Sequence, residues 1–347
     1  MKKIIIVVSI IVGFFVIVGV SGYAYFTIIE KKAESQIQTN LLRAKKIYDA
    51  IPIWHKKIHT QQDLKVGIIT DTHVHPTRIN KSDKSEDAPR QLKDKDVAPI
   101  RHFVEDMKVF QPNFIVHLGD VIEGTGDSDN VGIIGIKLVK AELDKIESPV
   151  YWVVGNHDLR SVTKEQFKDV LSLKSLTQTF DVGDYRFIIL DANYDKKNVS
   201  RTPTEGRYIR GHIPPQQIEW LKKQLATDKQ TFIFMHHGAF LDDSVGDYDE
   251  DKQANRMKQS IDNAKELQAI LDEYRVAGLF DGHMEARRFE KKGWTAYNSL
   301  TGTKKSRKYP DSYYELTITD GIPDITMYYL PQDKTEIKKV DFESGEK

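Results

Sequence analysis

The stretch KVGIITDTH at residues 65–73 places a short apolar run directly before two side chains that can bind metal ions. Apolar residues dominate 65–70, which is too short for a helix and is typical of a buried β-strand. Asp71 and His73 follow this run at once. The stretch therefore predicts a core strand whose carboxyl end carries potential metal ligands.

The same succession recurs along the chain. Strand-like runs at 113–118, 149–154, 231–235 and 276–280 precede the clusters Gly119-Asp120, Gly155-Asn156-His157-Asp158, His236-His237 and Gly282-His283-Met284-Glu285. Further strand-like runs lie at 185–190, 294–298, 313–319 and 325–330, the last three in an antiparallel pattern. Helical patterns cover 100–110, 133–146, 216–226 and 260–274, and the charge-rich 76–96 is predicted to be a loop. Strands that alternate with helices predict an α/β fold with mainly parallel sheets covered on both faces. The number of strands suggests that two sheets pack together.

Histidines concentrate at the predicted strand ends. Seven of the 11 histidines lie in or beside these clusters: His73, His75, His117, His157, His236, His237 and His283. In open α/β folds ligands bind at the carboxyl edge of the sheet. His117 lies inside a strand-like run and is predicted to be a packed, hydrogen-bonded histidine. The others predict a site with metal-binding side chains at this edge.

Composition excludes several classes of protein. Hydrophobic residues make up 39% and charged residues 29%, which supports a folded core and argues against disorder. Cysteine is absent, so any metal must be held by histidine, carboxylate or amide groups. Lys plus Arg and Asp plus Glu are each 51, and this balance argues against a basic nucleic-acid binder. No nucleic-acid partner is predicted, and the sequence indicates no oligomeric state.

In this order, the strand ends D-x-H, G-D, G-N-H-D, H and G-H-x resemble the calcineurin-like metallophosphoesterases over residues 65–300. The resemblance implies a four-layer α-β-β-α sandwich with a two-metal site on one edge. It also implies a metal-dependent phosphoester hydrolase, a phosphomonoesterase or phosphodiesterase, in which a bridging hydroxide attacks phosphorus. The alternative is a membrane-tethered metal- or phosphate-binding protein of the same fold with impaired catalysis.

The resemblance also implies ligands for two ions. Asp71 and His73 would hold one ion, and Asp120 would bridge both. The second ion would be held by Asn156, His236 and His283. His236 is favoured over its neighbour His237 because of its place in the family pattern.

Three further residues would act on the substrate or on the catalyst. His157 resembles the family's catalytic histidine, which stabilises charge and protonates the leaving oxygen. Glu123 would orient that imidazole, or it is an exposed loop residue. Arg160 would contact phosphate, since a guanidinium pairs well with two oxygens, or it forms a surface salt bridge.

Glu285 departs from the family pattern, which has a second histidine at this position. Its carboxylate would complete the Asp71/His73 site, or it points away and leaves that site weak. An oxygen-rich shell would favour Mn²⁺, Fe²⁺ or Mg²⁺ over Zn²⁺. Two divalent ions (Mn, Fe, Zn or Mg) are therefore expected, with manganese favoured.

The first 29 residues predict a membrane segment. Residues 4–29 contain no charged side chain, and as a helix they would span about 39 Å, more than the ~30 Å hydrocarbon core. An uncleaved single-pass anchor in the cell membrane is favoured over a cleaved signal peptide, with the catalytic domain outside the cytoplasm. The expected organisation is an anchor at 1–29, a helical stalk and linker at 30–64, the metallophosphoesterase domain at 65–331 and a charged tail at 332–347.

Overall fold

The computed structural model describes residues 63–85, 88–124, 129–200, 210–240, 260–303, 309–330 and 338–341. The predicted anchor at 1–29 lies outside these residues, as does the stalk up to residue 62. Within the described part of the chain, no helix is long and apolar enough to cross a membrane.

The first sheet has six strands in the order β14-β13-β12-β1-β4-β5. Its parallel half consists of β1 (Leu64–Ile69), β4 (Phe114–His117) and β5 (Val150–Trp152). Its antiparallel half consists of β12 (Tyr313–Thr319), β13 (Ile322–Tyr329) and β14 (Lys338–Asp341). Because β1, β4 and β5 are parallel, their carboxyl ends lie at the same edge of the sheet.

The second sheet also has six strands, in the order β10-β11-β9-β8-β7-β6. Its parallel strands are β7 (Tyr185–Ile189), β8 (Gln230–Phe234), β9 (Gly278–Asp281) and β11 (Thr295–Ser299). The edge strands β6 (Gln178–Val182) and β10 (Arg288–Lys292) are antiparallel to their neighbours. A separate hairpin joins β2 (Thr77–Arg78) and β3 (Arg90–Gln91).

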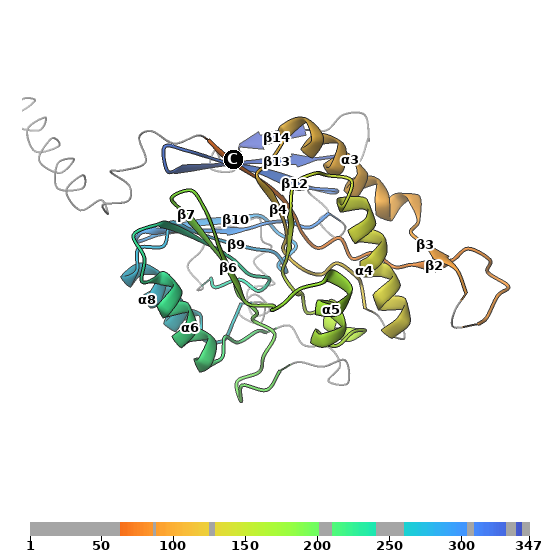
Figure 1. Cartoon of the computed structure of the whole chain (residues 1–347), viewed down its shortest axis with the longest axis horizontal. Coiled ribbons are helices and arrows are strands. Elements are labelled where there is room, and N and C mark those ends of the chain that lie inside the picture. The colour runs from red at the N-terminus through yellow and green to blue at the C-terminus, as the bar shows by residue number, and fades with distance from the viewer. Residues whose placement is uncertain are drawn as a thin grey trace, which may run out of the picture. The chain divides into compact units, whose positions relative to one another are not determined.

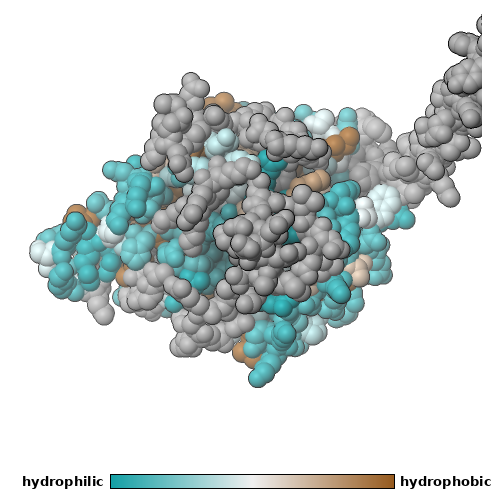
Figure 2. Space-filling view, turned by 180° about the vertical axis from the view of Figure 1, so that it is seen from behind, coloured by the Kyte–Doolittle hydropathy of each residue, from teal (hydrophilic) through white to brown (hydrophobic). Residues whose placement is uncertain are grey.

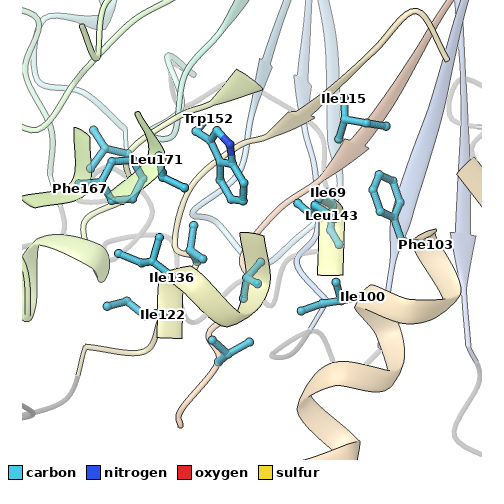
Figure 3. Close-up of a cluster of buried hydrophobic side chains, with 14 of the residues drawn as sticks. Ile69, Ile100, Phe103, Ile115, Ile122, Ile136, Leu143, Trp152, Phe167 and Leu171 are labelled. Atoms are coloured by element: carbon cyan, nitrogen blue, oxygen red, sulfur yellow. The ribbon is translucent and has the colours of Figure 1, made fainter. Parts of the chain in front are cut away.

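Helices cover the outer faces of the two sheets, and the sheets lie between them (Figure 1). On the first sheet pack α3 (Asp94–Phe110), α4 (Asp129–Leu143) and α5 (Lys164–Leu171), and on the second α6 (Pro215–Leu225) and α8 (Ala264–Glu273). Figure 3 shows Phe103 from α3, Leu143 from α4 and Phe167 from α5 around Ile115 and Trp152 of the sheet. On the side opposite to Figure 1, the described surface is mostly hydrophilic with scattered apolar residues (Figure 2).

Aromatic side chains fill the space between the sheets. Phe114 of the first sheet lies 5.1 Å from Phe180 and 4.8 Å from Phe187 of the second, measured between ring centroids. Phe187 in turn stacks on Phe232 at 5.7 Å. Phe114, Phe187 and Phe232 are all buried. This layer fixes how the two sheets face each other.

The predicted alternation of strands and helices is present, and the second sheet is mainly parallel as predicted, but the first sheet is half antiparallel. Antiparallel strands flank the parallel core of each sheet, because hairpins such as β12–β13 add strands at its side. Helix α3 begins at Asp94, inside the predicted loop, with two acidic residues in its first turn. Helix α5 and strand β6 have no counterpart in the prediction. Part of the predicted tail, Lys338–Asp341, pairs with β13 through main-chain hydrogen bonds that composition does not reveal.

Truncation of the aromatic layer tests its role in stability. Replacement of the buried Phe187 by alanine (Phe187→Ala) should lower the free energy of unfolding by about 3–5 kcal/mol, because a ring-sized cavity opens between the sheets. Denaturant titration followed by circular dichroism measures this loss. Val109→Ala is the control, since Val109 is 85% exposed, and it should change stability by no more than about 0.5 kcal/mol. Equal losses in the two variants would contradict this packing.

Candidate metal centre

Loops that follow β1, β4, β5, β8 and β9 meet at one edge of the sandwich. Backbone hydrogen bonds tie the first two loops together, from Asp71 N to Gly119 O and from His73 N to Asp120 O, each at 3.0 Å. In the second sheet, Gly282 N donates to His236 O at 3.1 Å. Main-chain hydrogen bonds therefore join the loops that carry the predicted polar clusters in pairs, β1 with β4 and β8 with β9.

The backbone at this edge adopts a conformation that side chains disfavour. Asp71, His73, Asp120, His283 and Glu285 all have positive φ, between 41° and 63°. Such angles cost free energy for residues other than glycine and concentrate at functional sites. The sequence tolerates this cost at five residues that bring carboxylates and imidazoles together.

Two glycines let the loops approach closely. A Cβ at Gly155 would lie 2.1 Å from both the backbone nitrogen and Oδ1 of Asp120. A Cβ at Gly282 would lie 2.5 Å from Asp71 Oδ2. Any larger residue would push the Asp120 or Asp71 carboxylate out of place.

Asp71, His73 and Glu285 form the first group of potential ligands. His73 Nε2 lies 3.6 Å from Asp71 Oδ1 and 2.8 Å from Glu285 Oε1. Asp71 and His73 are fully buried, and the Glu285 side chain is 21% exposed. The backbone nitrogen of His283 donates to both Asp71 oxygens at 3.2 Å, which orients that carboxylate.

Asp120, His236 and His283 form the second group. His236 Nδ1 donates to the carbonyl oxygen of Leu118 at 2.8 Å, so the lone pair of Nε2 faces the group. That Nε2 lies 3.1 Å from Asn156 Oδ1 and 3.2 Å from Asp120 Oδ1. His283 Nε2 is buried and accepts no hydrogen bond within the described part of the chain. An orphaned imidazole nitrogen beside a carboxylate fits a metal ligand.

Asp120 lies between the two groups. Its Oδ1 faces His236, while its Oδ2 lies 3.7 Å from His73 Nε2. A third group joins His73, Asp120 and His157. The single buried carboxylate therefore contacts both halves of the site.

The electrostatics of the site favour bound positive charge. Burial alone would raise the pKa of Asp120, but the charges of His236 and His157 outweigh it and hold the pKa well below its usual value. Burial lowers the pKa of His236, yet the Asp120 carboxylate outweighs it and raises the pKa to about 9. Hydrogen bonds to Asp71, Glu123 and Glu285 likewise overcome burial and raise the pKa of His73. The carboxylates thus stabilise protons on the neighbouring imidazoles, and a metal ion can take the place of these protons. The set of carboxylate, imidazole and amide donors suits two divalent ions.

His157 lies beside Asp120, and its side chain is 12% exposed. Its Nε2 is 4.0 Å from Asp120 Oδ2, and its backbone nitrogen donates to Asp120 Oδ1 at 2.7 Å. Its Nδ1 lies 2.8 Å from the carbonyl oxygen of Glu123 and 3.6 Å from the Glu123 carboxylate. Glu123 also lies 3.3 Å from His73 Nδ1, so it is a member of the site and not an exposed loop residue.

Arg160 contacts the predicted catalytic histidine. Its Nη1 lies 2.7 Å from His157 Nδ1. The guanidinium can donate to that nitrogen only when Nδ1 carries no proton, whereas the Glu123 carbonyl oxygen, 2.8 Å from the same nitrogen, accepts from it only when Nδ1 is protonated. Arg160 is half-buried on the 3₁₀ turn Asp158–Arg160. The sequence predicted either a phosphate contact or a surface salt bridge for Arg160. It did not predict this contact with an imidazole.

The remaining histidines differ in their roles. His117 is buried, as predicted, and stacks on Trp152 with ring centroids 5.3 Å apart. It accepts from Gly119 N at 3.2 Å through Nδ1, so Nε2 donates to the Thr72 hydroxyl at 3.1 Å. It thereby links the loop of Asp71 and His73 to that of Asp120. His237 is buried 4.5 Å from His283, ring to ring, but it belongs to none of the ligand groups among the described residues.

Asp158 is a supporting residue that the sequence prediction did not single out. Its buried carboxylate accepts from Ile122 N at 3.1 Å and from Gly155 N at 2.9 Å. Burial, with Asp120 nearby, raises its pKa to about 7. The residue ties together the loops that follow β4 and β5. The one feature of the sequence that could have indicated this role is the position of Asp158 directly after Asn156 and His157 in the Gly-Asn-His-Asp cluster.

Known proteins resemble this chain in sequence and in fold. The manganese-dependent ADP-ribose/CDP-alcohol diphosphatase of Xenopus laevis is 36% identical over 183 residues, covering 36% of this chain and 51% of that protein. The protein of the same name from Xenopus tropicalis is 20% identical over 187 residues, covering 38% and 54%. The chain thus spans about half the length of the curated relatives it matches. A dimetal phosphatase from Danio rerio shares the fold, with a TM-score of 0.58, 15% identity, and coverage of 80% of this chain and 99% of that chain.

A sequence model of the calcineurin-like phosphoesterases matches residues 64–284. That range begins with β1 and ends one residue before Glu285. It therefore includes all the proposed metal ligands except Glu285. The chain belongs to the calcineurin-like phosphoesterases, a family of hydrolases that act on phosphoester bonds.

Proposed function

We propose that this chain hydrolyses phosphoesters with two divalent ions held at the sandwich edge. One observation carries the proposal: Asp120 belongs to the second ligand group through Oδ1, and its Oδ2 lies 3.7 Å from His73 Nε2 of the first group. The first ion would be held by Asp71, His73 and Glu285, and the second by Asn156, His236 and His283, with Asp120 common to both. Two such ions would neutralise the charge of the phosphoryl oxygens and activate water for attack on phosphorus.

His157 is proposed as the catalytic residue. Its Nε2 faces the Asp120 side of the site, where a phosphoryl group would lie. A protonated ring would donate from Nδ1 to the Glu123 carbonyl oxygen and from Nε2 to the leaving oxygen, to which it would pass the Nε2 proton. Glu123 and Arg160 position the imidazole from its other side.

The proposed substrate class is a nucleoside diphosphate joined to a sugar or an alcohol. Support comes from the two Xenopus relatives, whose names describe diphosphatases that act on ADP-ribose and CDP-alcohols. Such substrates contain a phosphoric anhydride bond, and its hydrolysis needs the same attack on phosphorus. Simple phosphomonoesters and phosphodiesters are the competing substrates.

Metal removal and substrate choice test this function together. The chelated full chain should lose activity, and Mn²⁺ should restore it, because every proposed ligand is an oxygen or an imidazole nitrogen. Release of nucleoside monophosphate is measured with ADP-ribose and CDP-choline, and release of p-nitrophenol is measured with p-nitrophenyl phosphate and bis(p-nitrophenyl) phosphate. Full activity after chelation would contradict the metal-dependent mechanism. Metal binding without turnover of any compound would favour a binding protein of the same fold.

Two variants separate ligands from the catalyst. Asp120→Asn should lose bound metal and activity together, because it removes the charge common to both ions. His157→Ala should keep its metal and lose about 10²–10⁴-fold in kcat, the usual share of a general acid. Metal content by mass spectrometry and kcat are measured on the same samples. Loss of metal from the His157 variant would make that residue a ligand.

Membrane attachment is proposed from the uncharged run at 4–29. The full chain should sediment with membranes and resist extraction by high salt, because hydrophobic insertion is insensitive to ionic strength. Deletion of residues 1–29 should release the protein into the soluble fraction. Protease added to intact cells should digest the domain if it lies outside the cytoplasm. A full-length chain washed off by salt would contradict the anchor.

A further inference from the structure

A buried ion pair joins α5 to the loop that follows β7. Lys164 Nζ lies 2.6 Å from Asp191 Oδ2, and the two side chains are 8% and 2% exposed. Lys164 is the first residue of α5 after its N-cap Thr163, at the end of the helix where positive charge is disfavoured. Burial adds a further cost for an ammonium group that lacks compensating partners. The helix itself therefore gives no reason for a lysine at this position.

The loop after β7 compensates the buried charge. Lys164 Nζ also donates to the Asn193 carbonyl oxygen at 3.0 Å and lies 3.6 Å from the centroid of the Tyr194 ring. Such a ring attracts a cation to its electron-rich face. Gln217 of α6 binds the same loop, since it accepts from Asp191 N at 2.9 Å and donates to Asp191 O at 2.7 Å. The loop is thus held by two helices that cover different sheets.

Asn193 connects this loop to the loop that follows β5. The residue is fully buried, and its Nδ2 donates to Val154 O at 2.9 Å and to Asp191 Oδ1 at 3.2 Å. Its backbone nitrogen donates to the same Asp191 oxygen at 2.9 Å. The carboxylate can only accept, so it fixes the amide with Nδ2 toward Val154. This hydrogen bond links the second sheet to the first.

The chain between Val154 and the candidate metal centre is tightly packed. Val154 is 1% exposed and directly precedes Gly155, which has no room for a side chain beside the Asp120 backbone. Two residues further on, His157 N donates to Asp120 Oδ1 at 2.7 Å. A displacement of Val154 would therefore move Asn156 and His157 relative to Asp120.

We propose that Asn193 is a positioning residue that places the loop of Asn156 and His157 for catalysis. The Lys164–Asp191 pair holds Asn193 in place for this role. The inference rests on the proposed function, which assigns a metal ligand and the general acid to this loop. Small displacements of reacting groups cost large factors in rate, and groups that orient a metal ligand affect the affinity for the ion.

Removal of the Asn193 amide tests this role in the full chain. Asn193→Leu keeps the size of the side chain and removes the donor to Val154 O. Its kcat for ADP-ribose should fall by about 10–100-fold while KM stays within about 3-fold of wild type, because the loop acts in the chemical step. The affinity of the metal-free variant for Mn²⁺, measured by isothermal titration calorimetry, should fall by about 10-fold. Both are measured at a temperature at which circular dichroism shows the variant folded.

Gln230→Met is the matched control. Gln230 is 1% exposed and its Nε2 donates to Gly321 O at 2.7 Å, so it too holds a backbone carbonyl through a buried amide. It is the first residue of β8 and lies at the end of that strand opposite to the site. Gln230→Met should lower the melting temperature as Asn193→Leu does and leave kcat and Mn²⁺ affinity unchanged. A merely structural role of Asn193 predicts the same behaviour for both variants.

A double variant tests the ion pair without leaving one buried charge alone. Lys164→Met combined with Asp191→Asn removes both charges and the contacts of Lys164 with the Asn193 loop. Its kcat and its Mn²⁺ affinity should each fall by about 10-fold. Unchanged values would overturn the role of the pair, and they would decide against the inference even where Asn193→Leu does not fold.

The outcomes distinguish the inference from the function on which it rests. Wild-type Mn²⁺ affinity in Asn193→Leu, or equal losses in Asn193→Leu and Gln230→Met, would overturn the inference whether or not the chain turns over a substrate. A wild-type chain that binds Mn²⁺ but hydrolyses none of the substrates would overturn the proposed function alone, since the Mn²⁺ affinities still decide the role of Asn193.

Discussion

The rest of the site depends on a single buried carboxylate. Asp120 is 1% exposed and touches His73, His157 and His236, which come from three different strand ends. A buried charge without partners is expensive, so each surrounding loop must present a compensating group. Positive φ at the ligand positions and the close approach of Gly155 follow from this requirement.

The sandwich architecture delivers these groups from two independent sheets. Asp71, His73 and Asn156 come from the first sheet, and His236 and His283 from the second. The aromatic layer around Phe114 and Phe187 sets the distance between the sheets. Packing far from the site therefore controls how closely the ligands of the two sheets approach one another, and small core changes can alter ion binding without touching a ligand.

Sequence patterns predicted the strands and helices whose side chains are buried in a regular pattern or are able to bind metal ions. Apolar runs that end in Asp71-Thr72-His73 or Gly155-Asn156-His157 marked parallel strands and their ligand edge, because burial and metal chemistry both leave a side-chain signature. The antiparallel strands β12 and β13 were predicted, but the edge strands β6, β10 and β14 were not, since main-chain pairing leaves little signature in composition. Helix α5 has only eight residues and depends on the Thr163–Gln166 capping box, which is too local to stand out as a periodic pattern.

Within the site, side-chain types were predictable but their partners were not. Glu285 was a recognisable departure from the family pattern, yet two opposite orientations fitted the sequence until its contact with His73 was seen. The roles of Asp158 and Arg160 depend on hydrogen bonds between loops distant in sequence. Such contacts arise from the packing of whole loops.

Positive φ at five non-glycine residues also links folding to metal supply. Each such residue costs on the order of 1–3 kcal/mol, a notable fraction of the roughly 5–15 kcal/mol that stabilises a typical domain. Ions that bind only the folded chain stabilise the loops that contain these residues. Metal binding and folding are therefore coupled equilibria. Metal scarcity would then reduce the amount of folded protein that escapes proteolysis, and cellular abundance of the chain would follow the local concentration of its ions.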